Sequence, residues 1–129
     1  MNKFGSIVAT LLGLTGIAIG AFAAHGLKPL IGVESLQTFE TGVRYQMYHA
    51  LFLLCISVTN FLSKKQLSRV VYLTLIGVVF FSGSIYGLAT NALTSFDFGM
   101  IGFVTPIGGL LLLSAWLLVL ISAFKLKKY

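Results

Sequence analysis

The chain has 129 residues, of which 57% are hydrophobic and 9% are charged, and its formal net charge is +6. In soluble globular domains about a quarter of the residues are charged, so this composition excludes that class and indicates an integral membrane protein. At about 20 residues for each span, the chain holds one domain, residues 1–129, with four spans and no separate catalytic domain. The single cysteine, Cys55, excludes an internal disulfide and a CxxC metal or redox motif.

The basic residues lie in short flanks beside apolar segments, which is typical of topology determinants and not of a nucleic-acid surface. If the chain crosses the membrane four times, two basic residues, Lys28 and Arg44, fall on one side of the membrane. Seven fall on the other side, so we expect both termini in the cytoplasm. These seven are Lys3, Lys64, Lys65, Arg69, Lys125, Lys127 and Lys128.

The first span is predicted over residues 4–24, which carry no charge and match the hydrocarbon thickness as a helix. Ala21-Phe22-Ala23 imitates a signal-peptide cleavage site, but signal peptides have a shorter apolar core. Small residues recur at spacings of three or four, a pattern that favours close helix packing, and we expect this helix at the centre of the bundle. Gly26 is predicted to end it in a left-handed conformation, with Pro29 following.

The second span is predicted over residues 43–62, and it begins with the polar stretch FETGVRYQMYHAL. Ser35 is a plausible N-cap for a short interfacial helix over 35–42, which either leads into this span or bends at Gly42. Glu40 and Arg44 stand four residues apart, the spacing of an ion pair on a helix. A solvated surface pair is the plain structural interpretation of these two residues.

The third and fourth spans are predicted over residues 70–90 and 105–124. Gly83 and Gly87 form a small-xxx-small pair, which predicts tight packing at that end of the third span. Thr105 followed by Pro106 has the chemistry of a helix start, with the threonine as the cap. Trp116 lies near the middle of the fourth span and is predicted to pack inside the bundle. The whole pattern predicts an all-α membrane four-helix bundle.

Polar groups within membrane spans are costly, and here they converge in the half of the membrane away from the termini. In the structural interpretation, His49 bonds to a neighbouring helix and Arg44 reaches Glu40, Asp97 or a lipid phosphate. In the functional interpretation, a pocket binds a lipid headgroup, a quinone-like molecule or a metal. The ligand-binding residues would then be His25, Arg44, Tyr45, His49, Ser84 and Tyr86.

Other functions have weaker support in the sequence. A haem or copper site formed by His25 and His49, with Met47, would lack an acidic residue in the spans to hydrogen-bond to the ligating histidines. Catalysis lacks an HExxH motif and a nucleophile elbow, so no catalytic residue, metal ligand or cofactor is assigned. We expect a non-enzymatic protein that binds membrane lipid, a larger membrane complex or further copies of itself. A cofactor-binding protein or a small membrane enzyme is the alternative.

Four motifs carry a resemblance to a known family, in the order GAFAAHGL at 20–27, RYQMYHAL at 44–51, SGSIYGL at 82–88 and TPIGGLLLLSAWL at 105–117. They resemble the YwdK/YgdD-like family of small bacterial membrane proteins, which has mitochondrial relatives. Ala23 and Ala115 stand where many members have glycine. The resemblance implies a multi-pass protein with four helices in the bacterial inner or plasma membrane, and it implies no molecular function.

Overall fold

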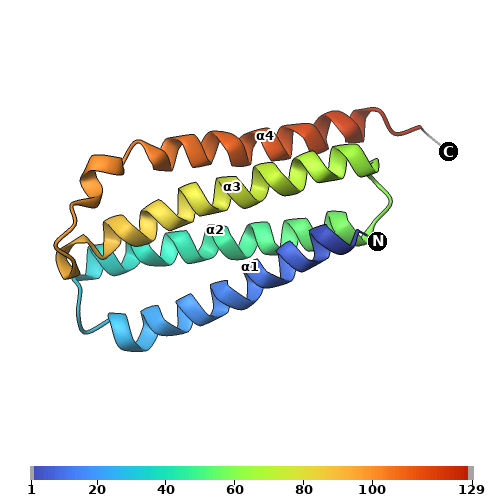
Figure 1. The fold of residues 1–129 in the computed structure, drawn as a ribbon. Helices are drawn as coiled ribbons and strands as arrows, with labels where there is room; N and C mark the ends of the chain where they lie inside the picture. The colour runs from blue at the N-terminus through green and yellow to red at the C-terminus, as the bar shows by residue number, and fades with distance from the viewer. Residues whose placement is uncertain (1, 128–129) are drawn as a thin grey trace.

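The computed structural model describes residues 2–127, and within them the fold is built from helices without any strand (Figure 1). The long helices are α1 Lys3–Phe22, α2 Val33–Val58, α3 Lys64–Ala89 and α4 Val104–Phe124. Three short segments join or extend them, namely the π-helix Ala23–Leu27 and the 3₁₀-helices Asn91–Leu93 and Phe98–Ile101. The predicted all-α four-helix fold is confirmed.

The helices alternate in direction, so α1 begins and α4 ends at the same end of the molecule (Figure 1). Packing runs from α1 to α2, from α2 to α3 and from α3 to α4. Helices α2 and α3 therefore occupy the middle, while α1 and α4 form the two edges (Figure 1). The expectation that the first helix is the packing centre is wrong, because its buried side chains face mainly α2.

Helix α2 is one continuous helix of 26 residues from Val33 to Val58. Of the two alternatives for residues 35–42, the structure has the one in which this segment leads straight into the span. Gly32, in extended conformation, occupies the N-cap position instead of Ser35. The helix ends four residues before the predicted Leu62, and its last turn is followed by an irregular connection.

Helix α3 begins at Lys64, well before the predicted start at Val70, because Ser63 and Gln66 form a capping box. The Ser63 hydroxyl accepts from the Gln66 amide at 3.3 Å, and the Gln66 side chain accepts from the Ser63 amide at 3.0 Å. The predicted cap of α4 is wrong. Phe103 stands at its N-cap without a side-chain bond, while Thr105 lies inside the helix.

The end of α1 also differs from the prediction. No residue of the described chain has a positive φ, so Gly26 does not adopt the left-handed conformation. The chain instead widens into a π-helical turn, Ala23–Leu27, and continues right-handed through Lys28. The turn buries Ala23 and Leu27 against α2 and leaves His25 exposed.

Glycines set two of the close helix contacts. A Cβ on Gly16 of α1 would stand 2.6 Å from Met47 Sδ of α2. A Cβ on Gly108 of α4 would overlap the backbone of α3, including the Gly77 carbonyl oxygen at 2.9 Å. Gly83, in contrast, has open space around it, so tight packing through Gly83 is not found.

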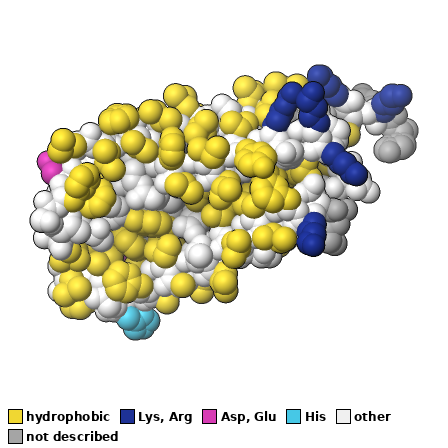
Figure 2. Space-filling view, in the orientation of Figure 1, with side chains coloured by type: hydrophobic (Ala, Val, Ile, Leu, Met, Phe, Trp, Pro, Cys, Tyr) yellow, Lys and Arg dark blue, Asp and Glu magenta, His cyan; other side chains and the backbone are white. Residues whose placement is uncertain are grey.

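Of residues 2–127, three segments are long and apolar enough to cross a membrane, and they comprise α1 with the π-helical turn, α3, and α4 with the preceding 3₁₀-helix. Helix α2 is not among them, since its first half carries Glu34, Glu40, Arg44 and several neutral polar residues. Hydrophobic side chains cover much of the surface, and the Lys and Arg side chains visible there gather where α1 begins and α4 ends (Figure 2). The cytoplasmic placement of that end stays a prediction.

Candidate functional site

Gln46 is the centre of the polar interior, and it is 4% exposed. Its side-chain amide donates to the Leu12 carbonyl oxygen at 3.0 Å and to Thr15 Oγ1 at 2.8 Å, both on α1. Its side-chain oxygen accepts from the Tyr86 hydroxyl of α3 at 2.7 Å. Because the Leu12 carbonyl can only accept, the orientation of the amide is fixed, and Gln46 ties α1, α2 and α3 together.

A second buried bond lies one turn from Gln46. The Ser82 hydroxyl of α3 donates to the Gly42 carbonyl oxygen of α2 at 2.7 Å. Gly42 also makes room for the Tyr86 ring, since a Cβ there would stand 2.7 Å from its Cε1 atom. The polar groups at this level therefore satisfy one another, as membrane interiors require, and they leave no free donor for a ligand.

His49 is buried between α2 and α4, and both of its ring nitrogens are engaged. Nδ1 lies 2.7 Å from the Tyr45 carbonyl oxygen, which can only accept, so Nδ1 carries the proton. Nε2 then accepts from the indole N–H of Trp116 at 3.1 Å. The ring is therefore the neutral Nδ1–H tautomer. No nitrogen lone pair is left for a metal.

Ser84 and Thr105 join α3 to α4 through a hydroxyl–hydroxyl bond. This contact explains why Thr105 does not cap α4. Trp116 is 49% exposed and stands at the edge of the bundle, so its predicted place inside is wrong. Its ring stacks on Phe52 with 4.1 Å between centroids, and this contact together with the His49 bond holds the indole in place.

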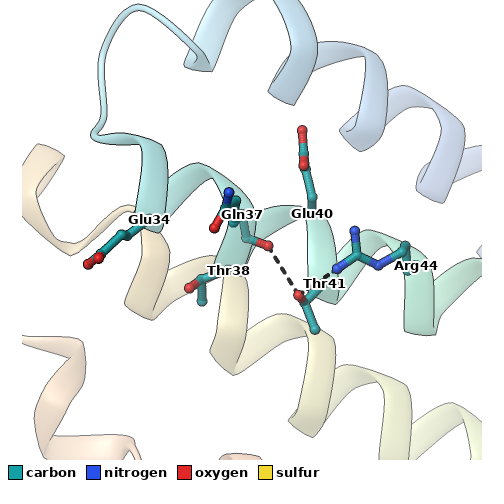
Figure 3. Close-up of a pocket in the computed structure, with 6 residues that line it drawn as sticks. All are labelled: Glu34, Gln37, Thr38, Glu40, Thr41 and Arg44. Atoms are coloured by element: carbon teal, nitrogen blue, oxygen red, sulfur yellow. Dashed lines mark hydrogen bonds between the residues drawn. The ribbon is translucent and has the colours of Figure 1, made fainter.

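Arg44 lies on the face of α2 opposite Gln46, with its side chain exposed. Its guanidinium donates to Thr41 Oγ1 at 2.9 Å and does not pair with Glu40 (Figure 3). Around it is an open depression formed by α2 alone, which we call the polar face of α2. The polar face consists of Glu34, Gln37, Thr38, Glu40, Thr41 and Arg44.

The six predicted ligand-binding residues therefore do not share one pocket. His49 and Ser84 are buried, and Tyr86 is half-buried with its hydroxyl bonded to Gln46. His25 is exposed on the π-helical turn, where its Nδ1 approaches the Ala21 carbonyl oxygen. Gly20 lies against Val43 and not against Arg44. Within residues 2–127 no group of three metal-ligating side chains occurs, and His25 and His49 belong to different regions.

A separate apolar groove lies between α2 and α4 and has α3 as its floor. Its volume is about 310 Å³. Tyr45 stands on the α2 side and packs on Phe81 of the floor with 5.0 Å between ring centroids. Gly109, Leu112, Leu113 and Trp116 form the α4 side. The groove is thus bounded mainly by aromatic and aliphatic side chains, together with His49.

Sequence reasoning missed two of these features. Gln46 shares a helix face with Phe39, Gly42 and Leu53, so its burial could have been found from the 3.6-residue period of α2. The same period places Arg44 on the opposite face. The groove depends on how far α4 stands from α2, and no local pattern reports that distance.

Comparison with known proteins places this chain in a family. Residues 19–109 match the family described as "Protein of unknown function (DUF423)". A UPF0382 membrane protein of Staphylococcus haemolyticus is 39% identical over 95% of this chain and 97% of the relative. UPF0382 membrane protein YwdK of Bacillus subtilis is 35% identical, with 92% and 94% covered.

UPF0382 inner membrane protein YgdD of Escherichia coli is 36% identical over 98% of this chain and 94% of the relative. None of these names states an activity. No solved structure matches the chain. The resemblance found in the four sequence motifs is confirmed, and the chain is a multi-pass membrane protein that belongs to the DUF423 family.

Proposed function

We propose that the protein is a non-enzymatic membrane protein that binds the headgroup of an amine-bearing phospholipid on the polar face of α2. The observation that carries this proposal is the arrangement of Glu40 and Arg44. They stand one helical turn apart on a face that no other helix covers, and they do not pair with each other. Each charge is therefore available to a group from outside the protein.

The order of the two charges fits such a headgroup. Glu40 lies about 6 Å nearer the end of the bundle than Arg44, at 1.5 Å rise per residue. In an amine-bearing phospholipid of the nearer leaflet, the phosphate lies closer to the acyl chains and the ammonium lies further out. The guanidinium of Arg44 can hold the phosphate by paired charge-assisted hydrogen bonds. The Glu40 carboxylate then meets the ammonium.

The remaining residues of the polar face favour the same ligand. Glu34 and Glu40 give the face two carboxylates against one guanidinium, so a purely anionic headgroup meets net repulsion. Gln37 and Thr38 are neutral, and the Thr41 hydroxyl accepts from Arg44 and donates to the Gln37 carbonyl oxygen, so these residues add no further charge to the face. A face that repels an anionic headgroup and pairs with an amine-bearing one is selective, whereas a single arginine that reaches the headgroup region is not.

Binding rather than catalysis is supported by the state of the buried groups. Among the predicted site residues, His49 and Ser84 are buried and have the chemistry of a base and a nucleophile. Both are bonded within the bundle, to Trp116 and Thr105. They stand apart from the polar face of α2, so the exposed charges have no reactive neighbour from this set.

The test measures the lipids that remain with the purified protein in mild detergent, by mass spectrometry of intact complexes. The wild-type chain should retain phosphatidylethanolamine over phosphatidylglycerol relative to the membrane from which it was extracted. Glu40→Gln should lower this preference about five-fold, which corresponds to about 1 kcal/mol for a surface charge contact. Arg44→Gln should lower the retention of both lipids, because both carry the phosphate that the guanidinium binds.

Arg69→Gln is the matched control, because it removes an exposed arginine at the opposite end of the bundle. It should leave the preference unchanged. A retained lipid mixture identical to the bulk membrane would refute the proposal. So would a second copy of the chain or another protein held on this face in place of lipid, lost in Arg44→Gln.

A further inference from the structure

We infer that the groove between α2 and α4 holds an acyl chain of the same phospholipid whose headgroup lies on the polar face of α2. This inference rests on the proposed function and adds a second contact site. It predicts that the protein recognises a whole lipid by headgroup and chain together.

The two sites are continuous along α2. Thr41 belongs to the polar face, and Tyr45, one turn further along the same side of the helix, lines the groove. On α4 the groove extends from Gly109 to Trp116, about 10 Å along the helix axis. A chain attached to a headgroup at Arg44 thus meets the groove on its way toward the centre of the membrane.

The surface of the groove is suited to hydrocarbon. Leu113 is 67% exposed, Trp116 is 49% exposed and Tyr45 is 40% exposed, so these side chains need an apolar cover. His49, which also lines the groove, has both ring nitrogens bonded and presents no free donor or acceptor. A hydrocarbon chain fits these apolar walls, whereas a ligand rich in hydrogen-bonding groups would leave many of those groups without partners.

Two features keep the groove open and its shape fixed. Gly109 has no side chain, and a Cβ placed there would stand 3.8 Å from the Phe81 ring, which is ordinary van der Waals contact. A larger residue at this position therefore fills the groove without striking the backbone. Trp116 forms a rigid wall, because it is bonded to His49 and stacked on Phe52.

Trp116 is also the only tryptophan of the chain, so its fluorescence reports on the groove directly. The protein is reconstituted in phosphatidylcholine vesicles that contain phosphatidylethanolamine or phosphatidylglycerol, brominated on an acyl chain, at equal mole fraction. Bromine quenches the indole on contact. We expect stronger quenching by brominated phosphatidylethanolamine than by brominated phosphatidylglycerol.

Gly109→Leu should lower quenching by both lipids, and Gly109→Ala should give an intermediate loss. Gly83→Leu is the matched control, because Gly83 has open space around it and lies on α3 away from the groove. It should behave like the wild type. Glu40→Gln should abolish the difference between the two lipids and keep the remaining quenching.

The outcomes separate the two proposals. Unchanged quenching in Gly109→Leu and Gly109→Ala, with the preference for phosphatidylethanolamine intact, overturns the groove and leaves the headgroup site. Equal quenching by both lipids in the wild type, with a loss in Gly109→Leu, overturns the headgroup site. Recovery of an isoprenoid quinone that relieves the quenching when added back overturns the acyl chain as the occupant.

Discussion

The indole N–H of Trp116 donates to Nε2 of His49, and this bond links α4, at one edge of the bundle, to α2 in the middle. Because Nδ1 of His49 is already bonded to the Tyr45 carbonyl oxygen, the pair selects one neutral tautomer of the histidine. This bond between two helices should be measurable as a coupling between the two side chains.

Trp116→Phe should lower the free energy of unfolding by about 1 kcal/mol, since Nε2 of His49 loses its hydrogen-bond donor inside the membrane span. His49→Leu removes the other partner. A double-mutant cycle, measured by unfolding in SDS, should give a coupling energy of about 0.6 kcal/mol or more. Strict additivity of the two changes would contradict the bond.

Gln46→Leu should destabilise the protein by about 2 kcal/mol, because it removes hydrogen bonds that join three helices and leaves the Tyr86 hydroxyl unpaired. Tyr86→Phe should have a smaller effect, about 1 kcal/mol. Tyr48→Phe is the control, since Tyr48 is exposed. If Tyr48→Phe destabilises as much as Gln46→Leu in SDS unfolding, the central role of Gln46 is wrong.

Gly83→Ala and Gly108→Ala should change stability in opposite directions. At Gly83 the added methyl group meets open space, so the gain in helix propensity raises stability by about 0.5–1 kcal/mol. At Gly108 it meets the backbone of α3, and the helices must separate, which costs about 1–3 kcal/mol. Melting temperatures in one detergent decide the comparison, and an equal shift in both variants would show that α3 and α4 are not in close contact.

The predicted topology can be tested with single cysteines in a chain where Cys55 is replaced by alanine, because Cys55 is itself exposed. In intact cells, a membrane-impermeant maleimide should label Thr94→Cys, in the connection between α3 and α4. It should not label Ser63→Cys, in the connection between α2 and α3, until the cells are opened. The reverse result would place both termini outside.

Several features of the fold could be predicted because they depend on local sequence. The apolar runs of α1 and α4 exceed the length of a span, so these helices were predicted to within a few residues. The early start of α3 was also visible in principle, since Ser63 and Gln66 have the spacing of a capping box.

The candidate site was predicted less well, because a residue's type and its depth in the span do not determine which way its side chain points. Arg44 and His49 lie on the same helix, about 7.5 Å apart along its axis, yet Arg44 is exposed and His49 is only 5% exposed. Their separation by five residues turns them to different sides of α2. The predicted pocket centred on Arg44 and the histidines, whereas the buried centre is Gln46, which was not among the predicted residues, together with Tyr86, which was.

The position of α2 between α1 and α3 has a consequence for how the protein is made. A segment with Glu34, Glu40 and Arg44 in its first half enters a bilayer poorly by itself, since one arginine at a helix centre costs about 2.5 kcal/mol or more. The connection from the π-helical turn to α2 spans only residues 28–32. We therefore expect the translocation machinery to release α1 and α2 together as a hairpin, with Gln46 already bonded to α1 before α3 arrives.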